Sequence, residues 1–302
     1  MAQLVGVTGT NGKTSTARWA AAALGASSAH PVLCLDSVAW RIGDRDLGGC
    51  RSEAALEAAL AAFADAGGDA GVIELTSHAL GTGFARALPF RVGVFTNLTP
   101  EHLDVHGTMA RYLACKAQLF VRLGPGSTAV LNANDDACRL LARLLPPNVD
   151  SVAYGHTARG ASWCDPDVTI TDVVVDEEGT SARLVWRVPR ADTVGSVRVL
   201  ALGAMFVENA VAAMLAASAC GVPLAAAAAA ISRCPPPPGR LVRLARAPDV
   251  YLDLAHTPDA LARTLITGRA LANLKGGRLL LVFGSGGQRD VAKRAAMGRA
   301  AR

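Results

Sequence analysis

Short apolar runs alternate with longer stretches of helical periodicity over the first 150 residues, and this alternation constrains the fold more than any other feature of the sequence. Five runs have the length and apolar content of buried strands: residues 4–7, 32–35, 71–75, 92–96 and 129–131. Four segments have the spacing of helices: residues 14–24, 53–66, 109–123 and 136–145. Elements that alternate in this way predict an α/β fold with a mostly parallel sheet.

The pattern changes after residue 167. Two apolar runs, 168–175 and 184–188, flank the turn formed by residues 177–180, which predicts an antiparallel hairpin at one edge of the sheet. Residues 206–219 and 224–232 return to helical composition. Four prolines and a glycine follow at positions 235–239, and prolines cannot continue a helix.

We therefore expect a central domain over residues 1–234, a proline hinge over 235–239 and a second domain over 240–302. The second domain is predicted to contain strands at 250–254 and 279–283, with a helix that begins at Pro258. Its length of about 63 residues is short for a doubly wound sheet, so we expect a shortened Rossmann-like domain.

The composition narrows the environment of the protein. Thirty Lys and Arg against 25 Asp and Glu give a net charge of +5, which is scattered along the chain and argues only weakly for a nucleic-acid partner. Seven cysteines without a C-x-x-C pair predict free thiols in a reducing compartment. The uncharged run 211–231 is alanine-rich and interrupted by Gly221 and Pro223, so two buried helices are expected there instead of a membrane span. These features predict a soluble cytoplasmic protein.

A glycine-rich loop joins the first predicted strand to the first predicted helix. The strict P-loop pattern places glycine where Val7 stands, but Gly9 and Gly12 allow backbone N–H groups to converge on phosphate oxygens. Lys13 would supply positive charge to the β and γ phosphates, and the Thr14 hydroxyl would ligate Mg²⁺. The alternative is a glycine-rich turn with a solvated lysine.

Two further side chains follow predicted strands. Glu74 ends one buried strand, and His102 comes after the end of another. Because the carboxyl ends of parallel strands line the ligand crevice of an open sheet, both side chains can face phosphates held by Lys13 and Thr14. A helix N-cap for Glu74 and a surface position for His102 are the alternatives.

Three segments, in this order, resemble the Mur ligases, a family of ATP-dependent amide-bond ligases of peptidoglycan synthesis. They are residues 9–14 (GTNGKT), 74–80 (ELTSHAL) and 94–109 (VFTNLTPEHLDVHGTM). The last two resemble the branch that adds the third residue of the stem peptide, the MurE-like UDP-N-acetylmuramoyl-tripeptide synthetases. The resemblance runs from Gly6 to about Met297 and implies a P-loop-containing central Mur ligase domain in which Gly9, Thr10, Asn11, Gly12, Lys13 and Thr14 bind ATP.

The same resemblance implies a catalytic group of Lys13, His102 and Lys116. It implies Mg²⁺ ligation by Thr14, Glu74, His102 and Lys116, and contacts of Ser77 and His78 with substrate. Lys116 would bind the metal as a carbamate formed with CO₂, because a plain ammonium repels Mg²⁺ whereas a carboxylated amine offers two oxygens. A solvated helix lysine is the alternative.

Residues on both sides of the hinge resemble the nucleotide contacts of the family. The resemblance implies that Asn209 contacts the adenine, Arg240 the nucleotide, Asp253 the ribose and His256 the base. Closure of the two domains would then assemble the site and exclude water. The segment 284–290 with Lys293 and Arg294 resembles the glycine-rich turn of the same domain.

The sequence departs from the family in its substrate-binding parts. Relative to the family, we expect the sequence to lack the N-terminal domain for uridine diphosphate and the second half of the C-terminal domain, either as a minimal ligase or as a fragment of a longer gene product. The paired threonines and proline that contact the muramyl peptide are also absent between Ala39 and Ala55. The expectation is therefore a ligase with altered substrate recognition.

The predicted reaction joins a carboxylate, from a small molecule or a peptide, to an amine through an acyl phosphate, using ATP and Mg²⁺. One alternative is a cyanophycin-synthetase-like ligase. Another is an ATP-binding module or inactive paralogue whose missing elements come from a protein partner or from self-association.

Overall fold

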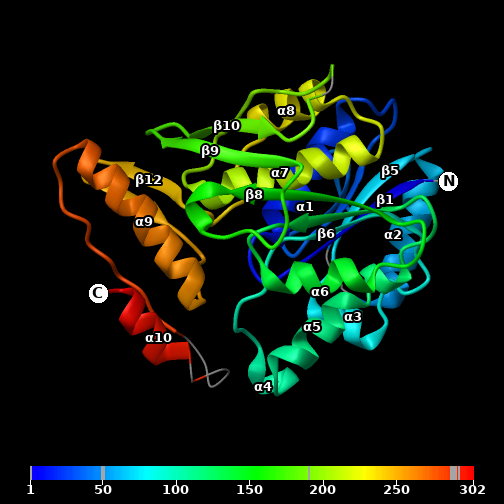
Figure 1. Ribbon diagram of the computed structural model, residues 1–302, viewed down its shortest axis with the longest axis horizontal. Helices are drawn as coiled ribbons and strands as arrows, with labels where there is room; N and C mark the ends of the chain where they lie inside the picture. The colour runs from blue at the N-terminus through cyan, green and yellow to red at the C-terminus, as the bar shows by residue number, and fades with distance from the viewer. Residues whose placement is uncertain (1, 49–51, 190, 286–290, 292) are drawn as a thin grey trace.

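One large sheet organises the chain, and its centre is parallel as predicted (Figure 1). The computed structural model describes residues 2–48, 52–189, 191–285, 291 and 293–302. Eleven strands follow the order β11-β10-β9-β8-β7-β6-β1-β5-β2-β3-β4. The parallel strands are β1 (Gln3–Thr8), β2 (Leu33–Leu35), β5 (Ala70–Glu74), β6 (Phe90–Phe95), β7 (Thr128–Asn132), β8 (Asp150–His156) and β9 (Val168–Val175).

Both edges of the sheet are antiparallel. The predicted hairpin is confirmed as β9 and β10 (Thr180–Trp186), with β11 (Ser196–Val199) outside them. At the other edge β2 pairs with β3 (Trp40–Ile42), and β3 pairs with β4 (Arg45–Asp46). Neither β3 and β4 nor the parallel strand β8 was expected from the sequence.

Helices cover both faces of the sheet (Figure 1). The sheet and these helices form two apolar clusters. Helices α1, α7 and α8 contribute side chains to one cluster, and α2, α5 and α6 contribute to the other. The predicted helix 109–123 is shorter in the structure: α5 ends at Ala117, and a short 3₁₀ helix, η1, follows. The bounds are α1 (Lys13–Gly25), α2 (Glu53–Asp65), α3 (Ser77–Thr82), α4 (Leu103–His106), α5 (Met109–Ala117), η1 (Phe120–Arg122), α6 (Asp136–Leu144), η2 (Thr157–Arg159), α7 (Ala204–Ala219), α8 (Leu224–Arg233), α9 (Pro258–Leu274) and α10 (Lys293–Ala300).

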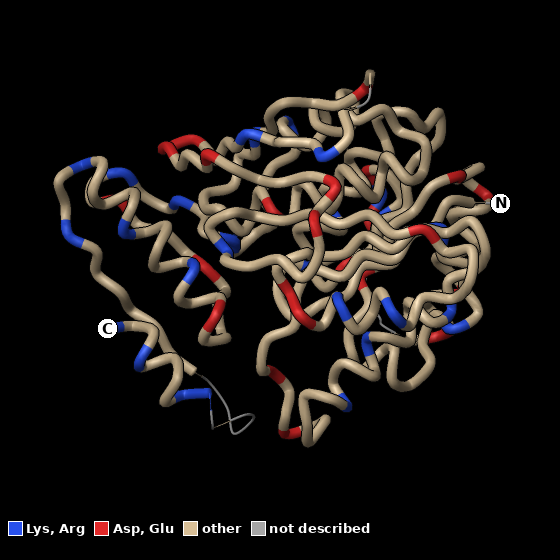
Figure 2. Tube along the Cα trace, in the orientation of Figure 1, with Lys and Arg blue, Asp and Glu red and all other residues tan. Residues whose placement is uncertain are grey.

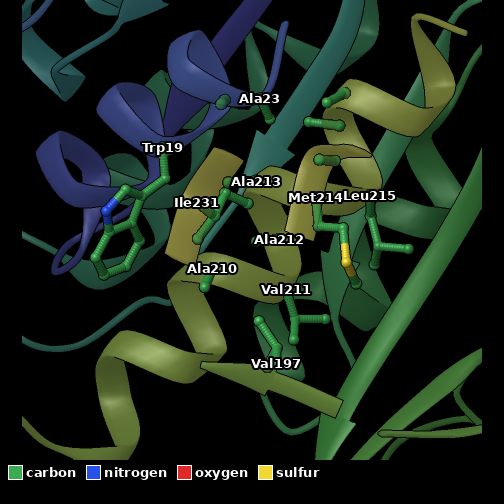
Figure 3. Close-up of a cluster of buried hydrophobic side chains, with 14 of the residues drawn as sticks. Trp19, Ala23, Val197, Ala210, Val211, Ala212, Ala213, Met214, Leu215 and Ile231 are labelled. Carbon is green, nitrogen blue, oxygen red and sulfur yellow. The ribbon is translucent and has the colours of Figure 1, made fainter. Parts of the chain in front are cut away.

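The packing of α1 on α7 forms the centre of the larger core (Figure 3). Residues 206–217 of α7 are all buried, which suits a helix that is apolar on nearly every face. The Trp19 ring of α1 meets the Phe206 ring edge to face, with 6.1 Å between centroids. The uncharged run 211–231 forms the end of α7 and most of α8, as expected, and no described helix is long and apolar enough to cross a membrane.

The chain after the prolines forms a smaller unit beside the main sheet (Figure 1). Strands β12 (Val242–Arg246) and β13 (Asp249–Leu252) pair antiparallel, and α9 and α10 follow them. The predicted strand 250–254 therefore exists, as β13, with a partner that the sequence did not reveal. The domain limits 1–234, 235–239 and 240–302 stay a prediction.

The predicted strand 279–283 is wrong. These residues have no strand partner in the described part of the chain, and Leu280 and Val282 are 82% and 99% exposed. An apolar run becomes a strand only where a neighbouring strand accepts its hydrogen bonds, and the β12–β13 pair does not do so. The glycine-rich segment predicted at 284–290 lies largely outside the described residues.

Replacement of Trp19 by alanine tests the α1–α7 interface. The indole is fully buried, so we expect its loss to lower the free energy of unfolding by about 3–5 kcal/mol. Urea denaturation followed by circular dichroism measures this change. The control Leu140→Ala, on the half-exposed face of α6, should change it by less than about 1 kcal/mol. Equal losses in both variants would contradict the central place of this interface.

Candidate functional site

The glycine-rich loop lies between the end of β1 and the start of α1, in the order that the sequence predicts. Gly9 and Gly12 have φ angles of 143° and 86°. A Cβ atom on Gly9 would lie 1.9 Å from Thr96 Oγ1, and one on Gly12 would lie 2.3 Å from Asn209 Oδ1. The first-turn N–H groups of α1 have no acceptor within the helix, so the loop is shaped to present them to an anion.

Asn97, after the end of β6, holds this loop in place. Its backbone carbonyl accepts from Thr10 N (2.8 Å), and its side-chain Oδ1 accepts from Asn11 N (2.9 Å). Its Nδ2 donates to Asn11 O (3.0 Å), and Thr96 Oγ1 donates to the same carbonyl (2.7 Å). Sequence analysis did not single out Asn97, although it lies within the segment 94–109 that carries the family resemblance.

The structure brings Thr14 and Glu74 together. The Thr14 hydroxyl donates to Glu74 Oε2 at 2.9 Å, and Ser37 N donates to the same oxygen at 2.8 Å. A hydroxyl and a carboxylate are the hard oxygen ligands that Mg²⁺ prefers, with phosphate oxygens and water completing its shell. These two residues therefore fit the predicted metal site, although no group of three or more His, Cys, Asp and Glu side chains in the described chain forms a metal site by itself.

Two lysine amines donate hydrogen bonds to carbonyl groups of the loop. Lys13 Nζ donates to Thr10 O and Lys116 Nζ donates to Gly9 O, both at 2.6 Å. Lys116 is only 1% exposed, and its amine lies 4.4 Å from the centroid of the Tyr112 ring. Burial lowers the pKa of the Lys116 amine well below its usual range, and the charge of Lys13 lowers it further. The structure thus contradicts the alternative of a solvated helix lysine.

His102 lies at the start of α4 with a φ of 55° and an exposed side chain. Its Nε2 is 3.6 Å from Glu101 Oε2, and its ring meets that of Tyr112 at 6.4 Å between centroids. No described hydrogen bond or ion pair joins it to Glu74 or Lys116. The structure therefore does not bring His102 into contact with the other predicted metal ligands.

Ser77 and His78 begin α3, beside Glu74. Ser77 is buried, and its Oγ lies 2.9 Å from His106 Nε2. His78 lines a cavity of about 360 Å³ together with Trp40, Glu74 and other residues of β2, α2 and α3. This cavity opens next to the Thr14–Glu74 pair, which is where the sequence predicts substrate.

Asn209, Arg240 and Asp253 line a second crevice together with Gly12. The carboxylate of Asp253 accepts from Leu241 N (2.7 Å) and from Ala255 N (2.6 Å). Burial raises the pKa of Asp253 in spite of these two donors. Three of the four predicted nucleotide contacts from α7 and the second unit thus share one crevice.

His256, the fourth, lies elsewhere. Its Nε2 is 3.0 Å from Glu101 Oε1, outside the residues that line the crevice. Burial opposes ionisation of Glu101, but the hydrogen bond with His256 and the charge of Lys13 prevail and lower its pKa to about 2. Glu101 was not singled out from the sequence.

The second unit contacts the glycine-rich loop directly. Asn11 Nδ2 donates to Asp259 Oδ2 at 3.3 Å, and Thr257 Oγ1 lies 3.5 Å from Asn11 Oδ1. With the His256–Glu101 pair, these contacts join residues on the two sides of the prolines. Charges of both signs are interspersed over the described trace, and no continuous basic stripe is visible in the view of Figure 2.

Comparison with known proteins identifies the family. The Mur ligase middle domain matches residues 7–217, and the family described as "Mur ligase, glutamate ligase domain" matches residues 239–302. The chain belongs to the Mur ligase family.

Named relatives are similar over almost the whole of this Mur ligase. It is 37% identical to UDP-N-acetylmuramoyl-L-alanyl-D-glutamate--2,6-diaminopimelate ligase of Xanthomonas campestris pv. campestris (strain 8004), covering 98% of this chain and 58% of the relative. It is 36% identical to UDP-N-acetylmuramyl-tripeptide synthetase of Roseiflexus sp. (strain RS-1), covering 99% and 60%. A solved UDP-N-acetylmuramoyl-L-alanyl-D-glutamate--2,6-diaminopimelate ligase superposes with a TM-score of 0.75 at 30% identity, over 99% of this chain and 60% of that one.

The predicted fold class and the MurE-like recognition are confirmed by these matches. The chain spans about 58–60% of the length of these relatives.

Replacement of Asn97 by alanine tests the support of the loop in this Mur ligase. We expect Mg-ATP to bind about tenfold more weakly, because the variant loses two side-chain hydrogen bonds that fix the Asn11 backbone. Isothermal titration calorimetry measures the affinity. Asn134, which ties a loop after β7 through contacts with His156 and Gly160, provides the control Asn134→Ala. Affinities that fall equally in both variants would contradict a specific role for Asn97.

Proposed function

We propose that this chain carries the catalytic machinery of an ATP-dependent ligase that joins a carboxylate to an amine through an acyl phosphate. The observation that carries the proposal is the meeting of three features in one place. They are the glycine-rich loop itself, the Thr14–Glu74 pair and the buried amine of Lys116. The names of two relatives, one a ligase and one a tripeptide synthetase, support it.

In this mechanism the loop N–H groups and Lys13 bind the triphosphate, and Thr14 and Glu74 would hold Mg²⁺. The metal would neutralise charge on the phosphoryl group during transfer. The substrate carboxylate attacks the γ phosphorus, and the bond to ADP breaks. The amine then attacks the acyl carbon, loses a proton, and expels inorganic phosphate as the amide forms. Positioning and charge stabilisation are the contributions of the protein.

We propose further that Lys116 carries a carbamate. Burial depresses its pKa, so that a larger fraction of its amine is neutral and has a free lone pair. The nitrogen attacks the carbon of CO₂ and releases one proton, which leaves an anion with two oxygens on a long stem. That group suits a place beside Mg²⁺, whereas an ammonium would not.

The carboxyl donor would occupy the cavity beside Ser77, His78 and Glu74. Trp40 forms part of its wall, within the segment where the family threonines and proline are missing. We therefore propose a small molecule or a peptide as donor and an amine as acceptor. A protein partner or a second copy would supply any further substrate contacts at the mouth of the cavity. The free thiols of the described cysteines fit a reducing compartment such as the cytoplasm.

Release of inorganic phosphate tests the proposal. The protein, Mg²⁺ and ATP are incubated with amino acids and acidic peptides, with and without amine acceptors, and hydroxylamine traps the acyl phosphate as a hydroxamate. We expect release that depends on donor and acceptor and that Lys13→Ala abolishes. Tight Mg-ATP binding without donor-dependent release from any member of the panel would favour an ATP-binding module instead.

The carbamate has its own test. With ¹³C-bicarbonate, nuclear magnetic resonance should show a carbamate signal in the wild type that is absent from Lys116→Arg, because guanidinium does not add CO₂ in this way. The same variant should lose about 10²–10³-fold in kcat, the cost of removing one charge-stabilising group. Lys275→Arg, on the exposed end of α9, is the control and should retain both signal and rate. A signal that persists in Lys116→Arg would contradict the proposal.

A further inference from the structure

A buried acid interrupts the apolar helix α7. Glu208 is 6% exposed, and it lies within the buried run 206–217, in which only Glu208 and Asn209 are polar. An ionised carboxylate in such a place costs several kcal/mol unless it is well paired. Its Oε1 lies 3.0 Å from His156 Nδ1, and its Oε2 lies 3.1 Å from Arg263 Nη1. Burial opposes its ionisation, but the bond with His156 and the charges of Arg263 and Arg159 hold the pKa below its usual value.

Arg263 reaches Glu208 from α9, on the far side of the prolines. Its Nε lies 3.3 Å from Asp259 Oδ1, so both Nε and Nη1 have acceptors. The remaining nitrogen, Nη2, is buried and has no hydrogen-bond acceptor among the described residues. An unsatisfied buried donor is uncommon, and a site for a ligand acceptor is one physical reason to keep it.

The place of Arg263 indicates which part of a ligand it meets. It lines the same crevice as Gly12, Asn209, Arg240 and Asp253. A triphosphate held by the loop and Lys13 would direct the rest of the nucleotide along this crevice, past Met205 and Phe206. Asp253 offers this part of the ligand acceptors only, whereas Arg263 Nη2 offers a buried donor that has no acceptor among the described residues.

We propose that Arg263 positions the nucleoside part of ATP by donating from Nη2 to an acceptor on its ribose or base, and that Glu208 holds the guanidinium in place. The inference rests on the proposed function and adds to it a residue that none of the sequence motifs contains. Because Glu208 and Arg263 lie on opposite sides of the prolines, the pair also fixes α9 against α7 at the nucleotide crevice.

Arg263→Gln, compared with the wild type, tests the positioning role with two probes, Mg-ATP and magnesium tripolyphosphate. We expect Mg-ATP to bind about 10- to 150-fold more weakly, the range of a hydrogen bond from a charged donor. Tripolyphosphate should bind unchanged, because Lys13 and the loop are intact. Arg269→Gln, on the exposed side of α9, is the matched control and should bind both probes like the wild type.

Glu208→Gln removes the counter-ion while keeping its shape. We expect a smaller loss of ATP affinity, about three- to tenfold, again without change for tripolyphosphate. ATP analogues lacking the 2′-hydroxyl or the purine N7 identify the acceptor. The analogue that lacks the acceptor of Arg263 Nη2 should bind the wild type and Arg263→Gln with equal affinity, because neither complex can form this hydrogen bond.

Three results would overturn the inference. Unchanged ATP affinity in Arg263→Gln would show that Arg263 only forms an ion pair between the two units and does not contact the nucleotide. Equal weakening of ATP and tripolyphosphate would show a disturbed phosphate loop. A lower melting temperature with an unchanged ATP-induced shift would show a structural role only. A wild type that does not bind ATP would overturn the proposed function as well, which distinguishes that failure from the other three.

Discussion

The parallel pairing of β1 with β5 on one side and β6 on the other is the constraint on which the site depends. Val7 lies opposite Glu74, and Thr8 lies opposite Phe95. Because the three strands are parallel, their carboxyl ends lie together. The glycine-rich loop, the Glu74 carboxylate and Asn97 therefore all lie at that end of the sheet. A slip of one residue in β5 would turn Glu74 to the other face of the sheet, away from Thr14. Backbone register thus sets the distance between the proposed metal ligand Glu74 and the glycine-rich loop.

The phosphate loop also couples the two units of the chain. The backbone N–H of Asn11 donates to Asn97 in the central sheet unit, and its side-chain amide donates to Asp259 at the start of α9. The amines of Lys13 and Lys116 bond to neighbouring carbonyls of the same loop. A ligand that changes the conformation of these few residues therefore acts at once on the strand ends and on α9. The second unit needs no large interface of its own to respond to the nucleotide site.

The sequence predicted those features that have a local signal. The strands β1, β5 and β6 are continuous apolar runs, and the meeting of Thr14 with Glu74 followed from strand ends alone. It missed β3 and β4 because these short strands include Arg41, Arg45 and Asp46 and so form no apolar run. It missed β8, where only the middle of Asp150–His156 is apolar, because pairing with β7 and β9 decides its conformation. The run 279–283 shows the converse, since its composition indicates a strand but none of the described strands pairs with it.

Polar pairs that join the two units of the chain were beyond sequence reasoning. His256 meets Glu101 across 155 positions, and Asp259 meets Asn11 across 248. Neither residue of such a pair has a neighbour that reveals the other, so only the fold brings them together. The burial of a polar side chain then helps to distinguish a functional role from a structural one. A helix like α7 would pack at least as well with alanine at position 208, and apolar replacement of buried ions is often neutral or stabilising. Packing therefore does not explain why Glu208 and Lys116 are buried, whereas their proposed roles, Glu208 beside the nucleoside and Lys116 beside the metal, would.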